Sequence, residues 1–443
     1  MNNSKIGKLL KNYFPKLSKE IAFVMLGQVI AALGSLFGVR LLTGKVTPAV
    51  YGEISLGLTI GVLFQQLLFG PLSNSYLRFF SIADEKNEIT HFIKAVKKSS
   101  FQATLISLAL IICIIIAFLL KGYSKLVGLI LLSFLFMLIS SYNTFLDNLQ
   151  NAARQRIIVA WHQGIGSWLK YLVAIALIVI LGSTSSIAMA GFLLSSIIVF
   201  GSQVYFFNRS KYFRQNEIEK IEEQKNDQWV KAFWNYAFPS ILWGIFTWAQ
   251  LSSDRWALGL FTSTSVVGLY TAVYQIGYYP ISFFSGIIFQ FVLPIVFKLS
   301  GDASQEARME KSSRAIKIIV IGSLLFGVCA FAITFLFHKE LFSIFVASNY
   351  LRVSYLLPYM VLAGSLFSSG QFASIYFYNE IKPKKLICIK IFSSLIGLIF
   401  NFVFVGIWGL DGIVVSIVIY SVIYFLMVIF AVPQKIHNND RKS

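Results

Sequence analysis

The residues of this sequence most able to do chemistry are a few charged side chains enclosed in long apolar stretches. Lys170 stands near the middle of one of them, GIGSWLKYLVAIALIVIL. A Lys or Arg at the centre of a membrane helix costs about 2.5–3.5 kcal/mol on insertion scales, so such a residue is a candidate functional group. Arg40 and Arg255 lie near the ends of two other apolar stretches, and Arg78 follows a third in NSYLRFF. These four cationic side chains are the predicted binding residues for an anionic ligand.

Acidic residues in comparable positions are fewer. Asp254 precedes Arg255 directly, and Glu53 lies near the start of an apolar stretch. A carboxylate in this setting can take up a proton or another cation, so both are candidates for coupling to an ion gradient. The structural alternative is open for each charge: Asp254 and Arg255 would satisfy each other, and Lys170 would extend along its helix to the membrane surface.

The sequence predicts no metal, no cofactor and no catalytic residues. The cysteines Cys113, Cys329 and Cys388 lie inside apolar stretches without a C-x-x-C pattern, and the four histidines lack zinc-ligand spacing. No P-loop and no G-x-G-x-x-G motif opens a helix. Nucleotide hydrolysis is therefore not expected.

The elements that must position these charges are membrane-spanning helices. The chain is 57% hydrophobic and only 13% charged, with a mean hydropathy of +0.72. A helix rises about 1.5 Å per residue, so roughly twenty apolar residues cross a hydrocarbon core of about 30 Å. We predict an all-α membrane protein with twelve spans, at 21–42, 51–76, 99–120, 126–147, 157–181, 186–207, 232–257, 265–296, 315–337, 354–378, 386–408 and 411–432.

The basic residues predict the orientation of these spans. Of the 38 Lys and Arg, five lie in loops on one side, five lie in or at the edge of the predicted spans, and the other 28 lie on the side of the N-terminus. By the positive-inside rule, both termini are expected in the cytoplasm. The net charge of +19 is thereby attributed to topology and to attraction by anionic membrane lipids, and not to nucleic-acid binding.

A charged gap, NRSKYFRQNEIEKIEEQKNDQWVK, divides the chain into two halves of six spans each. Before the first span, lysines and apolar residues at helical spacing predict a helix on the inner membrane surface, with a flexible basic tail as the alternative. The predicted organisation is a basic interfacial N-terminus (1–20), an N-lobe (21–207), a cytoplasmic linker (208–231), a C-lobe (232–432) and a cytoplasmic tail (433–443).

The two halves carry similar segments. YGEISLGLTIG at Tyr51–Gly61 aligns with VGLYTAVYQIG at Val267–Gly277, with glycines at both ends of the alignment. Because six spans separate the copies, both would enter the membrane the same way round. This predicts two lobes related by a parallel pseudo-two-fold axis around a central cavity.

At these residues the chain resembles a known family. GVRLLTGKVTPAVYGEISL is similar to the first hairpin of bacterial polysaccharide flippases, and YAFPSILWGIFTWAQLSSDRWALGLFTSTSVVGLYTAVYQIG is similar to their seventh and eighth spans. These flippases export O-antigen, capsule and teichuronic-acid repeat units and belong to the multidrug/oligosaccharidyl-lipid/polysaccharide exporter superfamily. The resemblance covers nearly the whole chain.

The resemblance implies a flippase that moves a polyprenyl-pyrophosphate-linked oligosaccharide between the leaflets of the bacterial cytoplasmic membrane by alternating access. Its partners would be membrane lipids, glycosyltransferases and a polysaccharide polymerase. Three alternatives stay open: a multidrug or small-molecule antiporter, a peptidoglycan-precursor flippase, and a polysaccharide polymerase. The polymerase is disfavoured because polymerases generally carry a long external loop, and every predicted external loop here is short.

Overall fold

The computed structural model describes residues 3–210, 223–300, 306–379 and 383–432, and within these ranges every regular element is a helix. The chain forms two compact units, Met1–Trp248 and Ala249–Ser443. The all-α fold predicted from the apolar stretches is confirmed.

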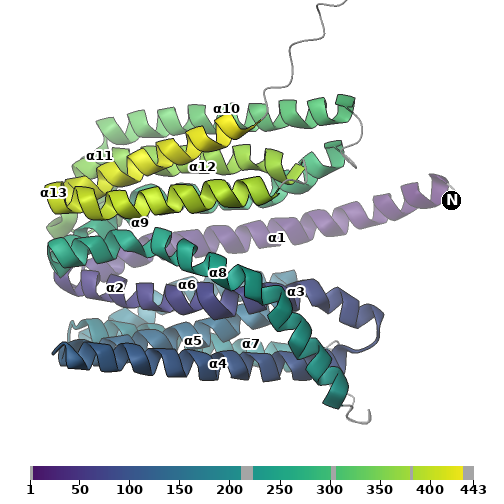
Figure 1. The fold of residues 1–443 in the computed structure, drawn as a ribbon, viewed down its shortest axis with the longest axis horizontal. Coiled ribbons are helices and arrows are strands. Elements are labelled where there is room, and N and C mark those ends of the chain that lie inside the picture. The colour runs from purple at the N-terminus through teal and green to yellow at the C-terminus, as the bar shows by residue number, and fades with distance from the viewer. Residues whose placement is uncertain (1–2, 211–222, 301–305, 380–382, 433–443) are drawn as a thin grey trace, which may run out of the picture. The chain divides into compact units, whose positions relative to one another are not determined.

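The first unit holds the N-terminal helices (Figure 1). They are α1 (Asn3–Thr43), α2 (Pro48–Phe64), the π-helix η1 (Gln65–Phe69), α3 (Gly70–Glu85), α4 (Ile89–Leu120), α5 (Ser124–Ala152), α6 (Arg156–Leu181) and α7 (Ser185–Arg209). The second unit holds α9 (Thr264–Ser300), α10 (Glu306–Leu336), α11 (His338–Phe345), the 3₁₀-helix η2 (Ser348–Leu356), α12 (Leu357–Asn379) and α13 (Pro383–Ala431).

The helix α8 (Glu223–Phe261) passes from one unit into the other. Its first part packs on the first unit, where the Phe233 ring lies 5.0 Å from Tyr76 and 5.3 Å from Phe92. The boundary between the units follows Trp248, whose indole donates to the carbonyl of Thr59 (2.9 Å). The predicted linker 208–231 lies earlier in the chain; its last residues are part of α8, and 211–222 lie outside the described residues.

Each of the twelve predicted spans corresponds to a helix or a continuous helical run. Ten runs of the described residues are long and apolar enough to cross a membrane, and one of them extends over 47 residues of α13. Gly409 breaks that run with a φ of 57°. The number of spans becomes twelve when the two parts of α13 are counted separately and α8, which is not among the ten, is added.

Local sequence signals place the helix ends. Thr47 accepts a hydrogen bond from the backbone N–H of Val50 (3.4 Å), and Pro48 follows it at the first helical position of α2. Thr184 caps α7 in the same way through Ile187 (3.3 Å). Gly182 ends α6 with a φ of 106°, a conformation that glycine adopts at little cost.

Helices α1 and α6 approach each other closely along a row of glycines. A Cβ atom added to Gly27 would lie 2.7 Å from the Ala160 Cβ, and one added to Gly38 would lie 2.0 Å from the Tyr171 ring. Small residues allow such contacts between membrane helices, where close van der Waals packing drives association. This packing fixes the orientation of α6, the helix that carries Lys170.

The two units share one order of helix packing. In the first unit α2 and α7 pack on α5, and α1 packs on α6. In the second unit α9 and α13 pack on α12 in the corresponding way. The end of α8 corresponds to α1, and its Ser253 hydroxyl accepts a hydrogen bond from Asn401 of α13 (2.8 Å). The glycines of the internal repeat take equivalent places: Gly61 faces Met137, and Gly277 faces Met360. A parallel repeat predicts that helices with similar sequences make the same contacts in both units, as these do.

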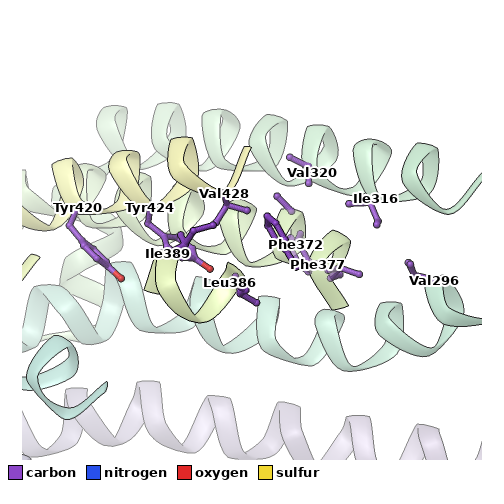
Figure 2. Close-up of a cluster of buried hydrophobic side chains, with 12 residues drawn as sticks. Val296, Ile316, Val320, Phe372, Phe377, Leu386, Ile389, Tyr420, Tyr424 and Val428 are labelled. Atoms are coloured by element: carbon purple, nitrogen blue, oxygen red, sulfur yellow. The ribbon is translucent and has the colours of Figure 1, made fainter. Parts of the chain in front are cut away.

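The second unit has its own apolar core among α9, α10, α12 and α13 (Figure 2). Tyr424 and Val428 of α13 lie against Phe372 and Phe377 of α12, and all four are at most 3% exposed. Close approach is again set by glycine, because a Cβ on Gly370 of α12 would lie 2.8 Å from the Tyr424 ring. The core and this contact hold the helices of the second unit together.

The substitution Gly191→Ala should destabilise the first unit. The added methyl group would lie 2.3 Å from the Ala174 Cα, so α7 has to move away from α6. Overpacking of this kind costs about 1–3 kcal/mol. Thermal unfolding of the purified protein in detergent measures the loss.

Gly201→Ala on the same helix is the matched control. Gly201 is exposed and has no other atom within 4 Å of an added Cβ. Its replacement should leave the melting temperature unchanged or raise it slightly, because alanine favours the helix by up to about 1 kcal/mol. Equal melting temperatures for the two variants would contradict the close contact of α6 and α7.

Candidate functional site

A polar cavity of about 250 Å³ lies within the first unit among α5, α6 and α7. These three helices pack against one another in the bundle (Figure 1). The residues that line the cavity are Phe136, Ser140, Asn143, Asp147, His162, Gln163, Gly166, Ser167, Lys170, Ser195, Ser196, Val199 and Gln203.

Helical periodicity explains why these residues converge. Each helix contributes polar side chains three, four or seven positions apart, and residues with these spacings share one helix face. The stripes are Ser140, Asn143 and Asp147 on α5, Gln163, Ser167 and Lys170 on α6, and Ser196 and Gln203 on α7.

Lys170 lies far from both ends of its helix. It stands about 21 Å from the first residue of α6 and about 16 Å from the last, at 1.5 Å per residue. Its Nζ lies 4.6 Å from the centre of the Tyr171 ring and 5.3 Å from that of Phe192, close enough for cation–π attraction. Among the described residues Lys170 forms no ion pair with a carboxylate. The ammonium group of Lys170 therefore lies beside aromatic rings of α6 and α7, and the side chain is half-buried. Binding of an anionic ligand by Lys170 stays a prediction.

Asp147 is a cavity residue that the sequence reasoning missed. Its carboxylate accepts hydrogen bonds from Gln163 Nε2 (3.0 Å) and Gln203 Nε2 (2.5 Å), and Gln28 Nε2 of α1 donates in turn to Gln163 Oε1 (2.8 Å). The predicted span ended at this residue, whereas α5 continues to Ala152. The polar spacing of Ser140, Asn143 and Asp147 was the signal that would have identified it.

Arg40, Glu53 and Arg78 do not line this cavity. Arg40 lies half-buried in the last turn of α1, and Arg78 is exposed on α3. The Glu53 carboxylate accepts a hydrogen bond from the hydroxyl of Ser185 (2.6 Å) and so links α2 to the start of α7. Their roles in ligand binding and ion coupling stay predictions.

Asp254 and Arg255 form a buried pair in the second unit, at 4% and 8% exposure. Arg255 Nη1 lies 3.2 Å from Asp254 Oδ1 and donates to the Leu251 carbonyl (3.0 Å), while the Tyr270 hydroxyl donates to Asp254. The Tyr274 ring lies 4.8 Å from the guanidinium carbon. A buried ion pair is stable only when further hydrogen bonds compensate for the loss of water around its charges. Here the bond from Tyr270 does so and joins α8 to α9. Cargo binding by Arg255 and ion coupling by Asp254 stay predictions beside this structural role.

The described residues hold no group of three or more His, Cys, Asp or Glu that could bind a metal ion. The cavity instead brings together one ammonium group, one carboxylate and several amides and hydroxyls. These groups can bind a charged or polar ligand within a membrane-spanning bundle.

The fold is similar to that of solved transporters. It matches a multidrug resistance MATE family transporter of the MOP superfamily in an inward-facing conformation, with a TM-score of 0.62, 16% identity and coverage of 93% of this chain and 96% of the other. It also matches the lipid II flippase MurJ in an inward closed conformation, with a TM-score of 0.65, 14% identity and coverage of 93% and 87%. At these identities the similarity shows the fold alone, which is that of a multi-pass membrane protein.

Sequence comparison identifies the family. No curated protein is similar enough in sequence to count as a match. A family model described as polysaccharide biosynthesis protein, however, matches residues 17–300, which is more than half of the chain. The chain therefore belongs to the polysaccharide biosynthesis protein family.

Proposed function

We propose that this protein is a flippase that moves polyprenyl-pyrophosphate-linked oligosaccharide repeat units from the inner to the outer leaflet of the cytoplasmic membrane, for O-antigen or capsule synthesis. The observation that carries the proposal is the combination of a polysaccharide biosynthesis family with a transporter fold. A transporter in such a pathway has an evident cargo, because lipid-linked glycans are built on one leaflet and used on the other.

The physical task is to pass a hydrated, anionic head group through hydrocarbon while its prenyl tail stays in lipid. A cation inside the protein lowers the cost, since charge pairs gain far more in a low dielectric than in water. Lys170 supplies such a cation, and an ammonium group bonded to a phosphate is a strong charge-assisted donor. The cavity is smaller than the roughly 300–1,000 Å³ of pockets for drug-sized ligands, so it would hold part of the head group and not the whole glycan.

The proposed topology places both termini in the cytoplasm, as the asymmetry of Lys and Arg predicts. The cargo would come from glycosyltransferases on the inner leaflet and pass to a polymerase on the outer leaflet. Movement would need no hydrolysis and would draw on an ion gradient, the membrane potential or removal of the product.

Depletion of the protein in the producing cell tests the proposal. Lipid-linked oligosaccharide should accumulate in the inner leaflet and surface glycan should disappear, and re-expression should reverse both. Leaflet-specific labelling and mass spectrometry of extracted lipid measure the two effects. Export of single, unpolymerised repeat units would indicate a polymerase, and accumulation of a peptidoglycan precursor would indicate another cargo.

Replacement of Lys170 by methionine should reduce glycan export about tenfold or more, because one charge-assisted hydrogen bond contributes about 1.5–3 kcal/mol. Lys170→Arg should restore part of the export, since it keeps the charge and the aromatic contacts. Quantitative blotting of surface glycan measures export, and membrane fractionation confirms that each variant is present.

Lys121→Met is the matched control, because Lys121 is exposed at the end of α4. It should export at the wild-type level. Wild-type export by Lys170→Met would contradict the assignment of Lys170 to the cargo.

A further inference from the structure

Three exposed arginines meet where α5 ends, α6 begins and α7 ends. Arg154 and Arg156 flank Gln155, whose Nε2 donates a hydrogen bond to the hydroxyl of Ser210 at the C-terminal cap of α7. Arg209 directly precedes Ser210 in the chain. This bond between the α5–α6 turn and the end of α7 brings Arg154, Arg156 and Arg209 together, and we refer to the three as the arginine cluster.

No described carboxylate neutralises the arginine cluster. Residues 148–210 include no Asp or Glu, and none of the three arginines forms an ion pair with a carboxylate in the part of the chain that the structure describes. The Arg209 guanidinium lies 4.6 Å from the centre of the Tyr205 ring, a cation–π contact that leaves its charge in place. The planar fork of N–H donors on a guanidinium matches the oxygens of a phosphate group, so the cluster is suited to a phosphate ligand.

Arg154 occupies a backbone conformation that favours glycine. Its φ is 61°, and the N–H of Gln155 donates to the carbonyl of Gln150 (2.8 Å), which closes the C-terminal end of α5. A residue with a Cβ atom is strained in this left-handed conformation, whereas glycine adopts it at little cost. The other described non-glycine residue with a positive φ is Asn87, a residue type that tolerates the conformation. A ligand bound by the guanidinium of Arg154 would offset the backbone strain.

Exposed aromatic side chains lie next to the arginine cluster on the same helices. Trp161 of α6 is 47% exposed, and Tyr205 of α7 is 51% exposed. Each stands four or five residues from the nearest arginine, which is about 6–8 Å along the helix axis. The two helices touch at this depth, because the His162 ring lies 5.6 Å from the Phe206 ring. Trp and Tyr gather at the head-group level of a membrane, so the cluster is expected beside the phosphates of the lipids.

From these observations we propose that the arginine cluster binds the head-group phosphate of one anionic phospholipid of the bilayer, phosphatidylglycerol. The partner is a lipid and not a soluble anion, because exposed apolar and aromatic side chains, Ile157 and Trp161 on α6 and Tyr205 on α7, continue from the cluster along the helices, where acyl chains lie. Basic pockets between membrane helices bind anionic head groups in this way. The site is a defined one, distinct from the general attraction that a net charge of +19 exerts on anionic lipids.

The test needs no glycan. The full chain, purified in detergent, is titrated with phosphatidylglycerol, phosphatidylcholine or inorganic phosphate, and thermal unfolding is followed by tryptophan fluorescence. Phosphatidylglycerol should raise the melting temperature by several degrees and to saturation, because it binds the folded state. Phosphatidylcholine, whose head group has no net charge, and inorganic phosphate at the same concentration should not. Added salt should reduce the shift, since ions screen exposed charges.

Three variants make the test specific. Arg154→Gly should raise the melting temperature without lipid, because glycine relieves the strained φ, and yet weaken the affinity for phosphatidylglycerol about tenfold, the effect of losing one charge-assisted hydrogen bond. Arg209→Gln should weaken the affinity to a similar extent. Arg314→Gln is the matched control, because Arg314 is an exposed arginine of α10 whose Nη2 already donates to Glu310 (2.7 Å). It should keep the full shift.

Other outcomes would overturn the proposal. Equal shifts with phosphatidylglycerol and phosphatidylcholine would show that any lipid stabilises the bundle, and an equal shift with inorganic phosphate would show an unselective anion site. Wild-type affinity in both Arg154→Gly and Arg209→Gln would exclude the arginine cluster. Loss of the shift in Arg314→Gln would show diffuse attraction by the whole basic chain. Stabilisation by a polyprenyl pyrophosphate and not by phosphatidylglycerol would identify the cluster as a cargo site, again against the proposal.

Discussion

In hydrocarbon every polar group has to find its partner inside the protein, and this constraint governs both units. The backbone meets it by forming helices, since all their hydrogen bonds are internal. Side chains meet it mainly by pairing across helices, as Asp147 does with Gln163 and Gln203 and as Asp254 does with Tyr270. Asp254 also pairs with Arg255, its neighbour on the same helix. Lys170, which forms no ion pair with a carboxylate among the described residues, is consequently a group that an anionic ligand would stabilise.

Close packing supplies the geometry that these pairs require. Glycines bring α1 against α6 and α6 against α7, so that the polar faces of the helices meet at hydrogen-bond distance. The same order of packing recurs in the second unit, with Gly277 against Met360 in place of Gly61 against Met137. The two units therefore share an order of helix packing but differ in their charged residues. Lys170 and Asp147 line the cavity of the first unit, whereas Asp254 and Arg255 form a buried pair in the second.

The sequence alone predicts the helices well because their length and apolarity follow directly from the thickness of the membrane. The glycine repeat predicts the equivalence of the halves, since glycine is used where helices touch. The partners of charged residues are harder to predict. Phe192 reaches Lys170 from a different helix, and Tyr270 reaches Asp254 across sixteen residues of chain. Asp147 was missed because hydropathy ended its span there, although the helix and its polar face continue.

The central claim is that the chain moves a lipid-linked glycan between leaflets. Its most direct test is a leaflet assay with purified protein in proteoliposomes that contain a labelled polyprenyl-pyrophosphate oligosaccharide. A membrane-impermeant glycosidase digests only the outward-facing glycan. The account predicts that digestion proceeds to completion with the protein present and stops near one half in protein-free liposomes. Digestion that stops near one half in both preparations would contradict it.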